Sequence, residues 1–225
     1  EVGLRQALGR IAACDMVNAE DNPAFDRSTV DGYAVRSQDL AAASAATPVS
    51  LRLVGEVRMG RGYDGKISTG EAVRIPTGGM LPDGADAVLM QEYTAVGVAE
   101  TVLAGRSVAR RENMVVRGDD VTAATVVLAA GSKIGVPDLG VLASCGFARV
   151  PVIKKPVVTV VTTGDEIIPP EAMPLPGQIR DVNSFTLAAL AELAGCEVIQ
   201  AERVADSQAG LTSVLQAALT KSDLI

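Results

Sequence analysis

The hydrophobic pattern of the chain changes along its length, and this change limits the folds that it can adopt. Over residues 27–128, short β-type runs alternate with turns rich in glycine and proline, a pattern that predicts a β-rich region. After residue 154, strand-like and helix-like segments alternate instead, as they do in α/β folds with a parallel sheet. The sequence therefore predicts a multidomain protein of mixed α/β and β class.

Local patterns predict the individual elements of the first two thirds of the chain. Strands are expected at residues 33–35 and in the runs LRLVGEVR, AVRI, DAVLMQ, TAVGVAE and SVAR. Apolar residues at helical spacing predict an opening helix over residues 4–14. Pro137 at a first helical turn, followed by Gly146 as a stop, predicts a compact helix over residues 136–145.

The sequence of the last third of the chain predicts the element order β-α-β-α. The run KKPVVTVVTTGDE contains one buried strand that ends in a polar glycine turn. The helix SFTLAALAELAG follows, with Asn183 or Ser184 as its N-cap, and then come the strand CEVIQAERV and a helix from Ser207. Residues 223–225 begin another strand. A sheet of so few strands cannot cover its helices, so we expect the gene product to continue.

These patterns predict three domains. A helical linker domain comprises residues 1–26 and 121–153, and a β-rich domain of residues 27–120 is inserted into it. Residues 154–225 form the third domain, an incomplete three-layer α/β domain.

Composition excludes several classes of function. The formal net charge is −7 and the chain has no Trp, so clustered cations and stacking platforms for nucleic acid are poorly supplied. The chain also has no His, which excludes the histidine-based nucleophile arrangements and the most frequent zinc ligand. Chemistry must therefore use carboxylates, hydroxyls, backbone groups or a hard metal ion.

Cysteine usage and hydropathy indicate the cellular location. Cys14, Cys145 and Cys196 are far apart among small or apolar neighbours, which predicts buried free thiols and favours a reducing compartment. No apolar run approaches the ~18 residues that a membrane span needs, and the first residues lack a signal-peptide pattern. We expect a cytoplasmic protein with no membrane partner.

Four polar clusters could carry chemistry. In FDRSTVDGYAVR, two carboxylates and several donors precede Gly32, although Asp and Ser are also common in ordinary turns. In IPTGGMLPDGAD, Thr77 precedes two glycines and could hold an oxyanion with its hydroxyl and nearby backbone N–H groups; a plain glycine-rich turn is the alternative. RRENMVVRGDDV mixes arginines with Asp119 and Asp120, and a solvated charge run is its default interpretation.

The fourth cluster, TTGDE, has the most informative position. It lies at the carboxyl end of a predicted strand, where open α/β sheets place their ligands. Asp165 and Glu166 are suited to a hard cation such as Mg²⁺, which takes one or two carboxylates together with phosphates and water. Many such turns nevertheless bind nothing.

In the same order, these clusters resemble the molybdopterin molybdenumtransferase (MoeA) family, which includes the gephyrin E domain. The matching segments are PAFDRSTVDGYAVR, RIPTGGMLPDGADAVLMQE, ENMVVRGDD, VVTTGDEI and PGQIRDVNSFTLAALAELAG. They are similar to the family patterns PxFDxSxMDGYAVR, RIxTGxxLPxGADxVxxxE, ENxRxxGxD, STGDEL and PGQIxDxNSxxLxALLxxAG. The resemblance covers essentially all 225 residues and implies that the third domain is of the molybdopterin-binding type.

The resemblance implies insertion of molybdate into adenylated molybdopterin, with Mg²⁺-dependent cleavage of the phosphoanhydride and release of AMP. The implied catalytic residues are Asp31, Thr77, Asp120 and Glu166, of which Asp120 and Glu166 would help to hold Mg²⁺. The implied cofactor-binding residues are Ser28, Arg36, Gly78, Arg117, Gly164, Asp165 and Asn183. The family also implies a homodimer with a shared site and a molybdopterin adenylyltransferase as the substrate donor.

The chain departs from the family pattern at a few points. Val30 stands where Met is usual, residues 114–116 replace a more basic run, and Pro76 precedes Thr77. The family's downstream GGxSxGxxD segment has no counterpart, so we expect this piece alone not to catalyse the full reaction. A dimeric scaffold of the same fold without catalysis is the alternative.

Overall fold

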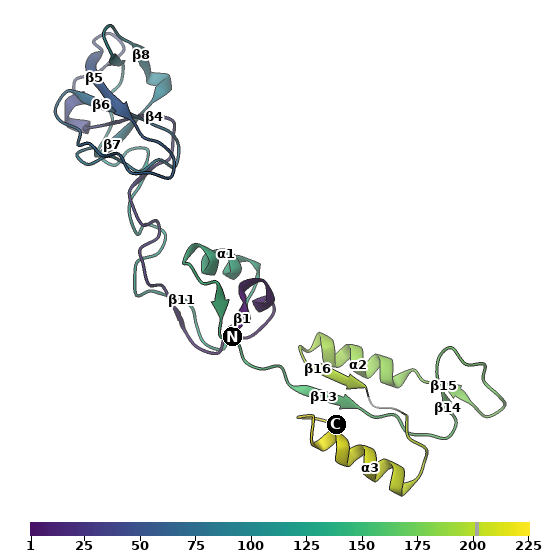
Figure 1. Ribbon diagram of the computed structural model, residues 1–225. Helices are drawn as coiled ribbons and strands as arrows, with labels where there is room; N and C mark the ends of the chain where they lie inside the picture. Colours follow the sequence, from purple (N-terminus) through teal and green to yellow (C-terminus); the bar gives the residue numbers. More distant parts are fainter. Residues whose placement is uncertain (201–202) are drawn as a thin grey trace. The chain divides into compact units, whose positions relative to one another are not determined.

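The computed structural model describes residues 1–200 and 203–225 (Figure 1). The chain forms two compact units. The β-rich unit comprises Asp15–Ala129 and Gly140–Phe147, and the α/β unit comprises Glu1–Cys14, Ala130–Leu139 and Ala148–Ile225. The three-domain division drawn from the sequence stays a prediction.

A six-stranded sheet forms the centre of the β-rich unit. Its strand order is β7-β4-β6-β5-β9-β8. Only β5 and β6 pair in parallel, and all other neighbours are antiparallel. The strands are β4 (Gly32–Val35), β5 (Val49–Glu56), β6 (Glu71–Ile75), β7 (Ala87–Met90), β8 (Thr94–Val96) and β9 (Thr101–Ala104).

Both faces of this sheet are covered by apolar side chains. Alternate residues of a strand point to opposite faces, and the buried residues of β4 and β7 follow this rule. Ala34 and Val88 belong to one hydrophobic cluster, whereas Val35 and Leu89 belong to the other. Both cores therefore fix the register of the central strands, because a one-residue slip would exchange the two sets.

Short antiparallel pairs and turns complete the β-rich unit. β2 (Met16–Val17) pairs with β11 (Val126–Leu128), and β3 (Arg27–Ser28) pairs with β10 (Met114–Val115). Two 3₁₀ turns, η2 (Ser37–Leu40) and η3 (Gln91–Tyr93), follow β4 and β7.

The α/β unit contains a parallel pair of strands with two helices. β13 (Val157–Val160) pairs in parallel with β16 (Glu197–Gln200), and β14 (Ile167–Ile168) pairs in parallel with β15 (Ile179–Arg180). The helices are α2 (Asn183–Leu193) and α3 (Gln208–Leu219). Ser207 caps α3, since its Oγ accepts a hydrogen bond from the N–H of Gly210 at 3.2 Å.

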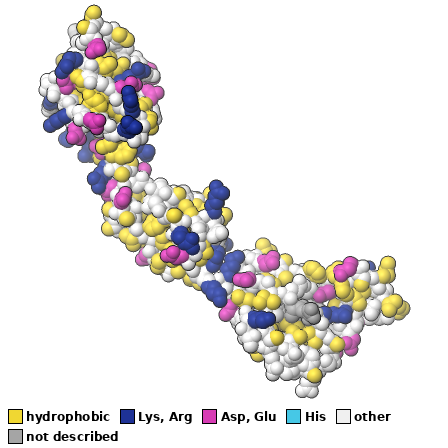
Figure 2. Space-filling view, viewed as in Figure 1, with side chains coloured by type: hydrophobic (Ala, Val, Ile, Leu, Met, Phe, Trp, Pro, Cys, Tyr) yellow, Lys and Arg dark blue, Asp and Glu magenta, His cyan; other side chains and the backbone are white. Residues whose placement is uncertain are grey.

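Apolar surface remains exposed in the α/β unit, and Figure 2 shows hydrophobic side chains gathered on its visible face. Leu193 on α2 is 85% exposed and Leu219 on α3 is 69% exposed. An apolar groove of about 580 Å³ lies along β13, lined by Val158, Val160, Leu187, Leu211, Leu215 and Leu224 among others.

The remaining elements are one short strand pair, a 3₁₀ turn and a helix. β1 (Val2–Gly3) pairs with β12 (Arg149–Val150), and η1 (Leu4–Ala7) follows β1. Helix α1 (Val136–Ser144) confirms the predicted helix to within one residue. Within the described residues, no helix is both long and apolar enough to cross a membrane.

Three predictions about local structure are wrong. The opening helix is only the short η1, because Gly9 turns the chain at φ +74° and residues 11 and 12 then form β-bridges with Lys133 and Val152. SVAR forms no strand, and the neighbouring TVLA forms β9 instead. The three cysteines are free, as predicted, but Cys14 is exposed and the other two are half-buried.

Two predictions in the α/β unit need refinement. Neither Asn183 nor Ser184 is the N-cap of α2, because the helix already begins at Asn183 and the N-cap position is Val182. The capping oxygen comes from Asp181, whose Oδ1 accepts from the N–H of Ser184 at 3.0 Å. The predicted strand CEVIQAERV is confirmed as β16, whereas its residues 201–202 lie outside the described residues. The strand expected at residues 223–225 is present as a single parallel bridge between Leu224 and Val158.

Candidate functional site

Two of the polar clusters are joined by backbone hydrogen bonds, although they are almost fifty residues apart. The N–H of Leu81 donates to the carbonyl of Asp26 at 2.9 Å. The N–H of Ser28 donates to the carbonyl of Gly79 at 3.0 Å, and the N–H of Gly78 donates to the carbonyl of Ser28 at 2.8 Å. The segment before β4 and the turn after β6 are therefore held side by side.

The third cluster joins the same place. β3 and β10 pair there, and the N–H of Thr29 donates to the carbonyl of Asn113 at 3.0 Å. The N–H of Arg117 donates to Oδ1 of Asp26 at 2.8 Å. Three segments that are distant in sequence thus meet within the β-rich unit.

Asp31 and Thr77 form the central polar contact of this site. Oδ1 of Asp31 accepts from the backbone N–H of Thr77 at 2.7 Å and from its hydroxyl at 3.0 Å. The backbone N–H and the hydroxyl of Thr77 therefore both donate to the same oxygen of Asp31. Oδ2 of Asp31 has no hydrogen-bond or ion-pair partner among the described residues.

These contacts favour the ionised form of Asp31. The backbone N–H of Thr77, and next its hydroxyl, lower the pKa of the Asp31 carboxyl, and the charge of Arg74 lowers it further. Because the side chain is exposed, Oδ2 is open to solvent. The site therefore presents an oriented carboxylate with one oxygen available as a hydrogen-bond acceptor or a metal ligand.

The glycine after Asp31 is required by close packing. A Cβ on Gly32 would lie 2.0 Å from the carbonyl oxygen of Leu89 on the paired strand β7. No side chain fits at that distance, so glycine allows β4 and β7 to approach and places Asp31 at the start of β4.

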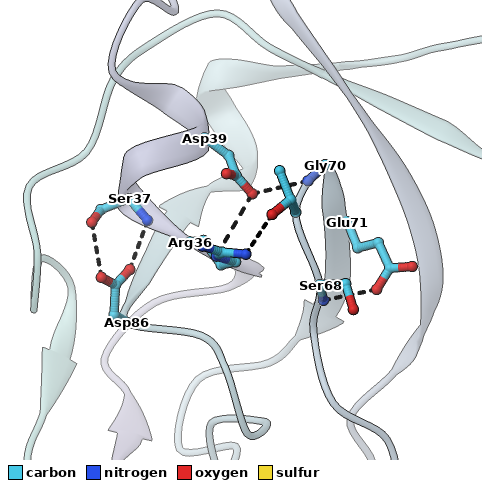
Figure 3. A network of polar contacts seen from close by, with 8 residues as sticks. Arg36, Ser37, Asp39, Ser68, Gly70, Glu71 and Asp86 are labelled. Carbon is cyan, nitrogen blue, oxygen red and sulfur yellow. Dashed lines mark hydrogen bonds and ion pairs between the residues drawn. The ribbon is translucent and has the colours of Figure 1, made fainter.

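Ser28 and Arg36 make contacts within the protein. The Ser28 hydroxyl donates to the carbonyl of Val30 at 2.6 Å, and this side chain is buried. Arg36 donates to the hydroxyl of Thr69 at 2.6 Å and lies 4.0 Å from Asp39. Figure 3 shows Arg36 in this network, beside the hydrogen bond from the N–H of Gly70 to Asp39. These two predicted cofactor-binding residues therefore have structural partners.

Arg117 and Asp120 each have a charged partner within the protein. Nε of Arg117 lies 2.7 Å from Oδ2 of Asp21, and Oδ2 of Asp120 lies 3.8 Å from Arg27. The backbone N–H of Ala123, and next the Arg117 side chain, lower the pKa of Asp21. Gly78 supplies a backbone donor at φ +80° in the turn that holds Thr77.

The remaining predicted residues belong to the α/β unit. Gly164 is buried at φ +139°, and a Cβ there would lie 2.9 Å from Oε2 of Glu166. Oδ1 of Asp165 accepts from the N–H of Asp206 at 3.2 Å. Glu166 and Asn183 are exposed, and Asn183 begins α2.

Two residues near these sites were not predicted from the sequence. Arg74 lines a small cavity with Asp31, and Asp181 caps α2. Arg74 could have been recognised as the one charged residue in the apolar run AVRI. It alternates with the buried Val73 and Ile75, so it lies on the other face of β6, which also carries the buried Ala72. Asp181 could have been recognised as a capping residue just before a predicted helix.

Each of the predicted Mg²⁺ ligands, Asp120 and Glu166, could supply one carboxylate to the ion. Within the described residues, no group of three or more His, Cys, Asp or Glu side chains is arranged to hold a metal ion. Asp120 and Glu166 lie in different units, and each offers hard oxygen donors. A single carboxylate of this kind suits an ion that takes most of its ligands from phosphates and water.

Comparison with known families agrees with the order of the motifs. A family model described as "MoeA N-terminal region (domain I and II)" matches residues 1–146, well over half of the chain. The chain belongs to the MoeA family. A second model, described as "Probable molybdopterin binding domain", matches residues 159–225 of this MoeA-family chain. The resemblance predicted from the motifs is confirmed.

Curated relatives share the whole length of this chain. A molybdopterin molybdenumtransferase of Staphylococcus aureus (strain MSSA476) is 36% identical over 225 residues, which are 100% of this chain and 53% of the relative. A protein of the same name from Staphylococcus epidermidis (strain ATCC 12228 / FDA PCI 1200) is 34% identical over 224 residues, again 100% and 53%. The chain thus spans about half the length of the curated relatives it matches.

Solved structures confirm the predicted multidomain fold class. A crystal structure of a molybdopterin biosynthesis MoeA protein from Pyrococcus horikoshii, 36% identical, matches with a TM-score of 0.88 over 99% of this chain and 57% of that chain. A second structure of a Pyrococcus horikoshii MoeA protein, 34% identical, gives a TM-score of 0.91 over 99% and 59%.

Proposed function

We propose that the protein inserts molybdate into adenylated molybdopterin and releases AMP, as a step of molybdenum cofactor biosynthesis. One observation carries the proposal, namely that three motif segments converge on an ionised Asp31 held by Thr77. The names of the relatives support the same chemistry.

Asp31 and Thr77 would act together at the reacting groups. Thr77 fixes Oδ1 of Asp31 with two donors, so Oδ2 keeps a defined direction. An oriented carboxylate of this kind would position a nucleophile or a metal ion at the phosphoanhydride as AMP leaves. The sequence had predicted that Thr77 donates directly to an oxyanion, whereas in the structure its donors act on Asp31.

Asp120 and Glu166 would hold Mg²⁺ together with substrate phosphates. The ion would supply charge neutralisation to the phosphoanhydride when bound. Asp165, Gly164 and Asn183 lie at or near the polar turn after β13 and the start of α2, a position suited to phosphates.

The proposal extends to partners and location. A homodimer would bring the β-rich unit of one chain to the α/β unit of another and complete a shared site. A molybdopterin adenylyltransferase would supply the adenylated substrate, and the reaction would take place in the cytoplasm.

The test is molybdate-dependent release of AMP from adenylated molybdopterin by the purified full-length protein. We expect release that needs both molybdate and Mg²⁺. An intact dimer that releases no AMP would contradict the enzymatic function and support a scaffold of the same fold.

A further inference from the structure

Most arginines of the β-rich unit are neutralised by a carboxylate. Six of them lie within 4.0 Å of an Asp or Glu oxygen, namely Arg27, Arg36, Arg52, Arg106, Arg110 and Arg117. Within the part of this unit that the structure describes, the guanidinium groups of Arg58, Arg61, Arg74 and Arg111 have no such ion pair. These four guanidinium groups are therefore available to bind an external anion, although the chain as a whole is acidic.

Three of the four unpaired arginines line two cavities that share a residue. Arg74 lines a cavity of about 190 Å³ with Asp31, Gln91 and Glu56. Arg58 and Arg61 line a cavity of about 380 Å³ that also includes Glu56. Arg111 lines neither cavity, and all three cavity arginines are exposed.

The loop that carries Arg58 and Arg61 packs beside the turn that holds Thr77. A Cβ on Gly78 would lie 3.4 Å from Cε of Met59, and a Cβ on Gly62 would lie 3.6 Å from Sδ of Met80. The loop with the two arginines is therefore next to the turn whose Thr77 donates to Asp31. Arg74 lies directly opposite Tyr33 in the pairing of β4 with β6, two positions from Asp31.

The carboxylates of the same cavities leave these arginines available. Glu56 and Asp64 line the larger cavity, yet neither forms an ion pair with Arg58 or Arg61 among the described residues. Each guanidinium keeps its planar set of donors, which matches the spaced oxygens of a tetrahedral oxyanion.

We infer that Arg58, Arg61 and Arg74 form an oxyanion-binding patch beside the Asp31–Thr77 pair. Its ligand class is a tetrahedral oxyanion, either a phosphate of the phosphoanhydride or molybdate itself. This inference rests on the proposed function and adds substrate-binding residues to it. The carboxylate of Asp31 would then lie beside a substrate whose negative charge these arginines neutralise.

The inference is tested by calorimetric titration of the full-length protein with pyrophosphate and, separately, with molybdate. We expect binding of at least one anion, weakened about tenfold or more in Arg58→Gln/Arg61→Gln, because two charge-assisted hydrogen-bond donors are lost. Arg74→Gln should weaken it similarly. Arg111→Gln removes the same charge from an unpaired arginine outside both cavities and should bind like the parent chain.

The two titrations separate the sources of the oxyanion. Selective loss of pyrophosphate binding assigns the patch to the phosphoanhydride, and selective loss of molybdate binding assigns it to the metal substrate. No binding of either anion by the parent chain, or equal losses in the Arg111 control, overturns the inference. Thermal melts of each variant show whether it is folded, and AMP release by the full-length protein tests the proposed function independently.

Discussion

The two units carry polar glycine motifs of similar composition, but they support these motifs differently. In the β-rich unit, Asp31 receives two bonds from a turn on another strand, above a sheet with a core on each face. In the α/β unit, Glu166 is exposed beside a glycine, and the apolar groove lies along a two-stranded pair. Convergence of distant segments, more than the motif itself, is what orients a functional side chain.

The largest expected effect tests whether Asp31 is functional or structural. Asp31→Asn in the full-length protein keeps an oxygen for the donors of Thr77 but removes the charge. We expect molybdate-dependent AMP release to fall about 1,000-fold, or about 4 kcal/mol, with little change in melting temperature. Asp83→Asn, another exposed carboxylate of the β-rich unit, is the control, and near-normal release by Asp31→Asn would refute the assigned role.

The second effect probes the packing that supports the site. Gly32→Ala places a methyl group against the Leu89 carbonyl, so we expect the β-rich unit to lose about 3 kcal/mol in chemical denaturation. Gly140→Ala has nothing within 4 Å of the new Cβ and lies in α1. It should be neutral or slightly stabilising, and an equal loss in both variants would show that the close approach is unimportant.

A smaller effect is expected in the α/β unit. Asp181→Ala removes the cap of α2 and should destabilise this unit by about 1 kcal/mol. Asp181→Ser retains a capping oxygen and should recover most of that loss. Hydrogen exchange of α2 amides, compared with those of β4, measures whether the loss stays within the α/β unit.

The smallest effect concerns acid stability. The pKa of Asp31 is lowered below its ordinary 3.8 in the folded chain. Its contribution to the free energy of unfolding is therefore fully present above the unfolded pKa and is lost as the pH falls through the folded pKa. Asp31→Asn should therefore lose less stability than the parent chain between about pH 4 and pH 2, measured by urea unfolding. An identical loss would show that Thr77 does not stabilise the ionised form.

Local patterns predicted much of the fold. The β-type runs identified most strands of the six-stranded sheet, because burial on one face of a strand leaves a period in the sequence. Helix-like segments that follow capping-type residues identified α2 and α3. The helix predicted over residues 4–14 failed at Gly9, whose positive φ ended it. Spacing alone could not show that Ile11 pairs with Lys133.

The site was only partly predictable. The sequence indicated Asp31 and Thr77 separately, yet their contact depends on strand pairing across 46 positions. Conversely, Arg36 looked like an anion contact, whereas Thr69 and Asp39 already bind it. The fold decides which polar side chains already have a hydrogen-bond or ion-pair partner. Neither composition nor motif spacing predicts these partners.

The most direct test of this account is a double-mutant cycle on AMP release, with Asp31→Asn, Thr77→Val and the double variant in the full-length protein. If Thr77 acts by holding Asp31, the double variant should be about as slow as Asp31→Asn alone, since residues that act as a unit are not additive. Losses that multiply would mean that the two side chains act separately, which would contradict the central claim.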